Sequence, residues 1–207
     1  FTNGIVYLDM AFPLEGIARE FLPWLPLASR FAIGAGLPGE SYDRVAQRLA
    51  RCAGGFSAIL DSGTPAPGAD GECAPRARSY AIFRLKALAE RFPQAVELAL
   101  SLLAGADYGD TKRVEDLYAE LRNDVVSAIV PAGNAFAQTR AASFFGEASA
   151  IDELWRGTSQ IEFLIGLKEA EGSSIAASLH ALSGSVFARK GLKLNITAEE
   201  EALPGAI

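Results

Sequence analysis

TNGIVYLDMAFPLEGI, residues 2–17, decides the fold of this chain, together with EFLPWLPLASR at residues 20–30 and AGGFSA at residues 53–58. Residues 3–12 are rich in side chains that favour a β-strand, and Pro13 ends that run. From residue 14 to residue 31 the pattern becomes helical in two pieces, because Pro23 and Pro26 each suit the first turn of a new helix. The chain therefore begins with a strand that leads into short helices.

Three later runs predict further strands, namely FSAILD at 56–61, SYAIFRLKA at 79–87 and LKLNIT at 192–197. Residues 62–77 hold many Gly and Pro residues and separate the first two of these runs. The spacing predicts an antiparallel hairpin with a long exposed loop.

The rest of the chain has the periodicity of helices, at 42–52, 93–105, 111–129, 134–145, 151–157, 160–170 and 174–190. Ser41 and Asp110 are predicted N-caps, and Ser149 with Asp152 has the spacing of a capping box. Strands in pairs between helical blocks predict an α+β fold, a two-layer sandwich of a mostly antiparallel sheet with helices packed on one face. A length of 207 residues fits a single domain over residues 1–207.

Composition limits the classes of partner. The net charge is −6, and no stretch combines clustered Lys and Arg with aromatic residues, which argues against binding nucleic acid or an anionic membrane. No apolar run approaches the roughly 18 residues of a membrane span, and no targeting segment is present, so we expect a bacterial cytoplasmic location. The start at Phe1, directly before a strand, indicates a piece of a longer chain. Cys52 and Cys73 are expected to remain two separate thiols.

The residues that carry chemistry are sparse. His180 is the only histidine and lies on a predicted helix, so we interpret it as a packed or surface residue. Catalytic zinc usually needs at least two histidines among three protein ligands, and this chain has one. Ser178 and Ser183 lie near His180, but the chain has no GxSxG motif of the kind that carries a serine nucleophile. The acidic groups Asp107/Asp110 and Glu199–Glu201 are expected to be helix caps and solvated charge. The sequence therefore predicts no catalytic, cofactor-binding or metal-binding residue in this chain.

One motif offers an alternative. Residues 34–39 read GAGLPG, a literal GxGxxG, and Asp61 follows Gly39 at nearly the spacing of the ribose-binding acid in dinucleotide folds. A dinucleotide-binding oxidoreductase domain would need a strand directly before Gly34. A helical pattern precedes Gly34 instead, and Pro38 removes one amide from the loop, so a helix-to-helix connection is the favoured interpretation.

The order of motifs resembles the third domain of presequence-protease-type peptidases, a branch of the pitrilysin/insulinase zinc metallopeptidases. The resemblance is carried by the first strand Thr2–Tyr7, by Phe12 and Leu14, by the Leu-Pro segment Leu22–Leu27, by Gly54–Ser57, and by Trp155-Arg156-Gly157 with Phe163-Leu164. It is good over residues 1–105 and weakens beyond.

The resemblance implies a non-catalytic domain at the start of the second half of such a peptidase. The family's zinc ligands and catalytic glutamate belong to its first domain, and the residues that bind the substrate terminus to its fourth, so none can be assigned here. The implied role is to form the wall of a closed peptide-degrading chamber, with zinc in the parent enzyme only. Its partners would be the other domains of the same peptidase and, in the parent, peptide substrates. A stand-alone non-catalytic partner of a two-subunit peptidase is a further alternative.

Overall fold

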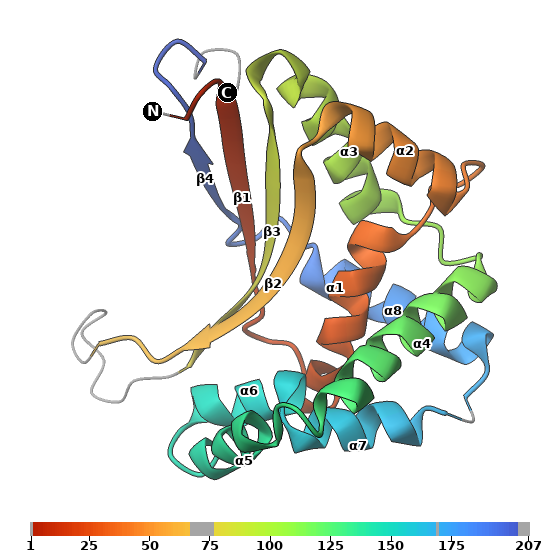
Figure 1. Cartoon of the computed structure of the whole chain (residues 1–207), viewed down its shortest axis with the longest axis vertical. Coiled ribbons are helices and arrows are strands. Elements are labelled where there is room, and N and C mark those ends of the chain that lie inside the picture. The colour runs from red at the N-terminus through yellow and green to blue at the C-terminus, as the bar shows by residue number, and fades with distance from the viewer. Residues whose placement is uncertain (1, 67–76, 169, 203–207) are drawn as a thin grey trace.

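In the part of the chain that the structure describes, four antiparallel strands form one sheet, and helices cover one of its faces (Figure 1). The computed structural model describes residues 2–66, 77–168 and 170–202. The strands lie in the order β2-β3-β1-β4, with bounds β1 Ile5–Pro13, β2 Gly55–Gly63, β3 Arg78–Leu88 and β4 Lys193–Thr197. The predicted α+β two-layer fold is confirmed.

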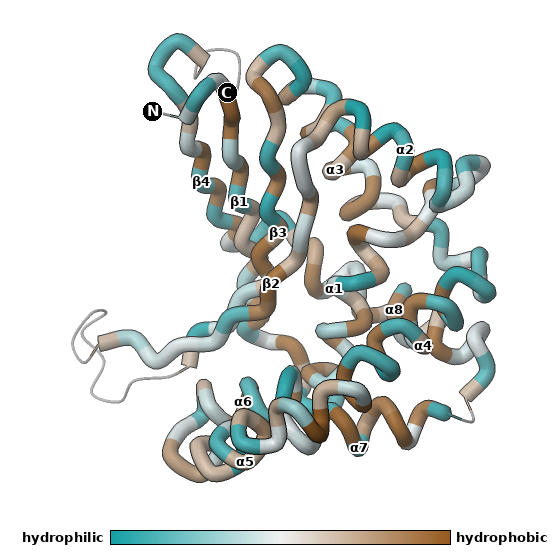
Figure 2. Tube along the Cα trace, viewed as in Figure 1, coloured by the Kyte–Doolittle hydropathy of each residue, from teal (hydrophilic) through white to brown (hydrophobic). Residues whose placement is uncertain are grey.

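Alternation along the strands decides which face the helices cover. In β1, Val6, Leu8, Met10 and Phe12 are buried while the residues between them are more exposed. The hydropathy colours alternate along the strands in the same way (Figure 2). This period of two is typical of an antiparallel sheet with one packed face and one open face. The predicted hairpin between β2 and β3 is confirmed by their antiparallel ladder.

The helical layer follows the chain around this single face. Its elements are η1 Arg19–Trp24, α1 Leu25–Gly34, α2 Tyr42–Cys52, η2 Ala89–Arg91, α3 Phe92–Gly105, α4 Thr111–Ala128, α5 Gly133–Ala142, α6 Glu147–Arg156, α7 Thr158–Gly166 and α8 Gly172–Val186.

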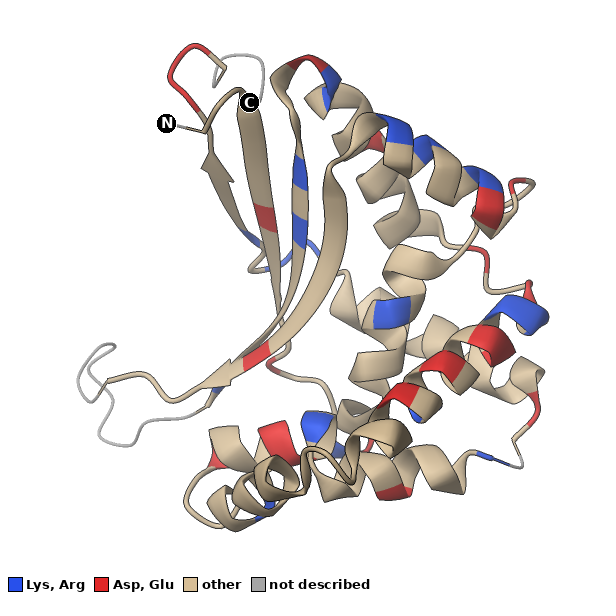
Figure 3. Ribbon diagram, viewed as in Figure 1, with Lys and Arg blue, Asp and Glu red and all other residues tan. Residues whose placement is uncertain are grey.

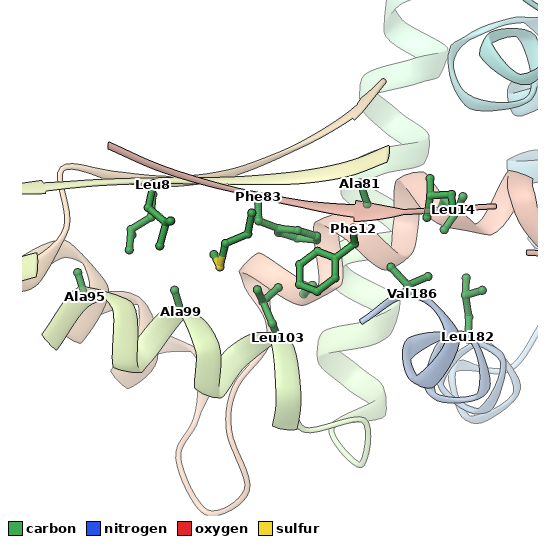
Figure 4. Packing of buried hydrophobic residues seen from close by; sticks show 14 of the residues in the cluster. Leu8, Phe12, Leu14, Ala81, Phe83, Ala95, Ala99, Leu103, Leu182 and Val186 are labelled. Atoms are coloured by element: carbon green, nitrogen blue, oxygen red, sulfur yellow. The ribbon is translucent and has the colours of Figure 1, made fainter. Parts of the chain in front are cut away.

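The main core lies between the sheet and helices α3 and α8. Figure 4 shows Leu8, Phe12 and Phe83 pointing from the strands towards the helices, which carry Ala95, Ala99, Leu103 and Val186. The rings of Phe12 and Phe83 meet edge to face, with centroids 5.9 Å apart. Burial of this apolar surface, at roughly 25 cal/mol per Å², is the main force that holds the two layers together.

Several predicted helix starts change in detail. Asp110 caps α4 as expected, because its Oδ1 accepts from the backbone N–H of Arg113 at 3.0 Å. Ser41 occupies the N-cap position of α2, but its side chain makes no capping bond. The predicted capping box of Ser149 and Asp152 is wrong, because α6 begins at Glu147 and both residues lie inside it.

Two predictions fall partly or wholly outside the described residues. Strand β2 continues to Gly63, so the predicted loop 62–77 begins later than expected, and its residues 67–76 are not described. Cys52 is a free thiol, whereas Cys73 lies outside the described residues. Among the helices that the structure describes, none is long and apolar enough to cross a membrane.

Candidate functional site

The face of the sheet turned away from the helices carries polar groups from all four strands. We call it the open sheet face. Its members are Tyr7, Asp9, Ala11, Ser57, Ile59, Asp61, Tyr80, Ile82, Arg84, Lys86, Lys193, Asn195 and Thr197.

Two contacts organise the charges of the open sheet face. The Nε of Arg84 lies 3.0 Å from Oδ1 of Asp9 on the neighbouring strand. The Nζ of Lys193 donates to the hydroxyl of Tyr80 at 2.7 Å and lies 4.8 Å from the centre of that ring. These cross-strand contacts hold the cationic side chains against the sheet rather than free in solvent.

A hollow of about 580 Å³ runs across one end of the open sheet face. Tyr7, Ser57, Arg84 and Lys86 line it, along with Asn195 from β4. Cations, hydroxyls and an amide can hydrogen-bond the carbonyl, N–H and carboxylate groups of an extended peptide. The open sheet face carries three cations and two carboxylates, a small positive excess in a chain whose net charge is −6.

The lone histidine is remote from that face. The ring of His180 lies 5.0 Å from the ring of Tyr108, which also stacks on Phe31 at 4.7 Å. Burial raises the pKa of Tyr108, and a hydrogen bond with Ser183 opposes that rise. His180 is therefore an exposed helix residue in an aromatic stack, as the sequence predicted. Within the described ranges, no group of three or more His, Cys, Asp or Glu side chains could hold a metal ion.

The glycine loop is a turn between two helices. Helix α1 ends at Gly34, so no strand precedes the motif. The N–H of Leu37 donates to the carbonyl of Glu40 at 2.9 Å, and the N–H of Glu40 donates back to Leu37 at 2.8 Å. Gly39 has φ of 80°, a left-handed conformation that favours glycine. These two amides are occupied inside the turn, which removes the basis of the dinucleotide alternative.

Arg113 holds the glycine loop from outside. Its Nε donates to the carbonyl of Gly34 at 2.8 Å, and its guanidinium lies 4.1 Å from the centre of the Tyr42 ring. A second guanidinium nitrogen lies 3.3 Å from Glu120. The loop is thus fixed to α4 by one arginine.

The acidic groups at element ends have structural roles. Oδ1 of Asp107 accepts from the N–H of Gly109 at 2.9 Å, which makes Asp107 a turn residue. Glu199 differs from the predicted solvated charge, because its Oε1 accepts from the N–H groups of Thr2 and Asn3 at 3.2 and 3.1 Å. It joins the segment after β4 to the segment before β1.

The Trp-Arg-Gly segment fastens helix α6 to the rest of the domain. Nε1 of Trp155 donates to the carbonyl of Leu22 at 3.1 Å, and the indole is buried. Arg156 donates to the carbonyl of Leu60 on the edge strand β2 at 2.9 Å and also pairs with Asp152 at 2.9 Å. One helix end therefore contacts both η1 and the sheet edge.

Glu153 is the residue that sequence reasoning missed. Its side chain is 3% exposed, and Oε1 accepts from Thr158 Oγ1 at 2.7 Å and from the N–H of Ser159 at 3.1 Å. Arg140 of α5 lies 3.5 Å from the same oxygen. A Cβ at Gly157 would collide with the Glu153 carboxylate and lie 2.8 Å from its backbone oxygen. In the sequence, the glycine four residues after Glu153 is the one sign that the Glu153 side chain lies close to the backbone of residue 157.

Comparison with known proteins matches the sequence to one family. A family model described as "Peptidase M-16C associated" matches residues 1–167. The chain is similar to presequence protease 1, chloroplastic/mitochondrial, of Arabidopsis thaliana, with 26% identity over 206 residues, 98% of this chain and 18% of that protein. It is also similar to protein HypA of Clostridium perfringens, with 23% identity over 97% of this chain and 20% of that protein.

A solved structure shares the fold. The crystal structure of a conserved protein from Enterococcus faecalis V583 superposes with a TM-score of 0.63 at 12% identity, over 98% of this chain and 46% of that one. The chain spans about a fifth of the length of the curated relatives described above.

Proposed function

The chain belongs to the family of peptidase M-16C associated domains, and from that premise we propose that it is a non-catalytic structural domain of a zinc metalloendopeptidase. In this proposal the open sheet face forms part of the wall of a closed chamber in which peptides are degraded. The observation that carries the proposal is the family match over residues 1–167 of a chain that covers only 18% of a presequence protease. Such a chain corresponds to one part of a much longer enzyme.

Zinc would be held elsewhere in that enzyme. The described residues lack a set of three suitable side chains, and the exposed ring of His180 is in contact with Tyr108. A zinc site of the usual kind needs three protein ligands around an open position. The donor set of the described residues does not fit the metal, and no catalytic step is assigned to them.

The open sheet face is the surface best suited to line a chamber. The opposite face of the sheet is filled by the core with α3 and α8, so it is closed to peptides. Enclosure of peptides near a metal excludes folded proteins and bulk water, which favours hydrolysis of short substrates. Arg84, Lys86 and Lys193 would attract acidic groups of such peptides without taking part in the chemistry.

The test measures bound zinc and peptide hydrolysis for the complete polypeptide that encodes this chain and for residues 1–207 alone. We expect stoichiometric zinc and turnover in the complete polypeptide, and neither in the 207-residue chain. Zinc with turnover in the shorter chain overturns the proposal, and so does a complete polypeptide without zinc-dependent hydrolysis. If the zinc-bearing region proves to be a separate gene product, the chain is a stand-alone partner instead.

A variant pair tests the role of the open sheet face. The double change Lys86→Ala with Lys193→Ala is expected to raise KM for an acidic peptide about fivefold with kcat unchanged, because an exposed charge contact contributes up to about 1 kcal/mol. Arg44→Ala with Arg51→Ala on the exposed surface of α2 is the control, because it also removes two exposed cations. Equal effects of the two variants would assign the change to overall charge and not to the face.

A further inference from the structure

Helix α5 and the residues that flank it form a surface with almost no charge. Between residues 125 and 146, Arg140 is the only Asp, Glu, Lys or Arg. Helix α5 buries none of its own residues, whereas α3 and α8, which also hold few charges, bury six each. The low number of charges on α3 and α8 is thus explained by the core, and that on α5 is not. We call residues 129–146 the α5 surface.

Large apolar side chains stand out from the α5 surface at both ends of the helix. Val130 is 91% exposed, Phe144 is 80% exposed and Phe145 is 88% exposed. Isolated exposed apolar residues are common on proteins, but several on one uncharged segment mark an interaction site. In Figure 3 the ribbon of α5 is almost entirely tan, while α4 carries red and blue along its length.

The patch continues into a groove. Phe144 borders a cavity of about 540 Å³ whose apolar wall includes Leu14, Ile17, Ile151 and Leu154. These residues come from the loop after β1 and from α6, so the groove separates the α5 surface from the start of the helical layer. An apolar side chain entering it would bury surface on several elements at once.

We propose that the α5 surface docks against an apolar surface of another domain of the same polypeptide, with Phe144 and Phe145 as its anchors. This rests on the proposed function. The relatives match 97–98% of this chain and are about five times longer, and 98% of it matches 46% of one solved chain. Most of such a polypeptide lies outside this fold and must pack against some of its surface.

The distribution of charge indicates which surface of this domain packs against the rest of the polypeptide. Interfaces between parts of a chain are depleted of charge in their centre and enriched in aromatic residues. The outward sides of α2 and α4 are rich in charge, and the open sheet face presents the ion pair of Arg84 and Asp9. The α5 surface alone among these combines exposed aromatic rings with a single charge.

The experiment uses the complete polypeptide, with photoreactive p-benzoylphenylalanine at position 145 in one sample and at position 47 in another. Gln47 is exposed on α2 and is uncharged, so it is the matched control. We expect position 145 to cross-link, within a single polypeptide, to residues outside 1–207, and position 47 to give no such product. Cross-links between two copies, cross-links to added phosphatidylcholine vesicles, or no product at position 145 would each overturn the inference.

A charge substitution gives a second measurement. Phe145→Glu should lower hydrogen-exchange protection of residues 129–146 at least tenfold in the complete polypeptide, while Gln47→Glu should leave it unchanged. Unchanged protection in Phe145→Glu contradicts docking. Zinc-dependent hydrolysis by the same polypeptide is measured independently. If the polypeptide hydrolyses peptides but position 145 gives no cross-link, only the docking inference is rejected. If the unsubstituted polypeptide does not hydrolyse peptides, the proposed function is rejected.

Discussion

Gly157→Ala tests the packing between helices α6 and α7. The backbone of Gly157 has φ of −98° and ψ of −165°, which any residue adopts, so the strain of an alanine comes from the contacts of its Cβ. Its methyl group instead occupies the position of the Glu153 carboxylate, which must leave Thr158 and Ser159. Hydrogen bonds to a charged group are worth about 1.5–3 kcal/mol each. Because the displaced carboxylate recovers part of this from water, we expect a loss of about 3 kcal/mol.

The assay is thermal and urea unfolding followed by circular dichroism. For a domain of this size, 1 kcal/mol shifts Tm by about 2–4 °C, so the expected fall is about 6–12 °C. Gly166→Ala is the matched control, since Gly166 ends the same helix and a Cβ there meets nothing within 4 Å. The control should be neutral or more stable by up to about 1 kcal/mol. Equal Tm values for Gly157→Ala and the unsubstituted chain would refute the account of Glu153.

Three further changes test other contacts. Trp155→Phe removes the indole N–H and leaves the buried Leu22 carbonyl without its hydrogen-bond donor. The free energy of unfolding in urea should therefore fall by about 1–3 kcal/mol, and an unchanged midpoint would contradict a role for that bond. Burial raises the pKa of Asp152 in the folded state, so the folded protein binds the Asp152 proton more tightly than the unfolded chain does. This proton stabilises the folded state in acid, and the stabilisation is lost as the pH rises through the folded-state pKa. Asp152→Asn should therefore gain stability relative to the unsubstituted chain as the pH rises from about 3 to about 6 in urea titrations, and a parallel pH profile would refute the assignment. Arg113→Ala releases the Gly34 carbonyl and should lower stability by about 1–3 kcal/mol in thermal unfolding, with Arg113→Lys failing to restore it because lysine lacks the planar guanidinium.

Local sequence patterns predicted where the strands lie in the chain, but not the order of the strands in the sheet. The runs at 56–61 and 79–87 become β2 and β3, paired antiparallel, because alternation and a turn-rich connection are properties of neighbouring residues. The position of β1 between β3 and β4 depends on contacts between distant segments. No short window of sequence contains that information.

The candidate site shows the same division. Alternation identifies which residues of β1 and β3 avoid the core, so the open sheet face follows once the strands are known. Glu153 was missed because a Glu among other charged residues of a helix normally faces water. Its burial arises only where the start of α7 meets α6 at Gly157. The capping-box prediction failed because α6 already begins at Glu147, so Ser149 and Asp152 lie inside the helix.

The position of β1 within the sheet also has a consequence for biosynthesis. Tyr7 pairs with Lys86 on one side and with Thr197 on the other, so β1 needs partners that are synthesised far later than itself. At translation rates of roughly 5–20 residues per second, β1 would wait on the order of 10–40 s for β4. During that interval one edge of a largely apolar strand stays unpaired, and such an edge is prone to aggregation. Chaperone capture of the nascent chain would therefore be most useful between completion of the β1–β3 ladder and arrival of β4.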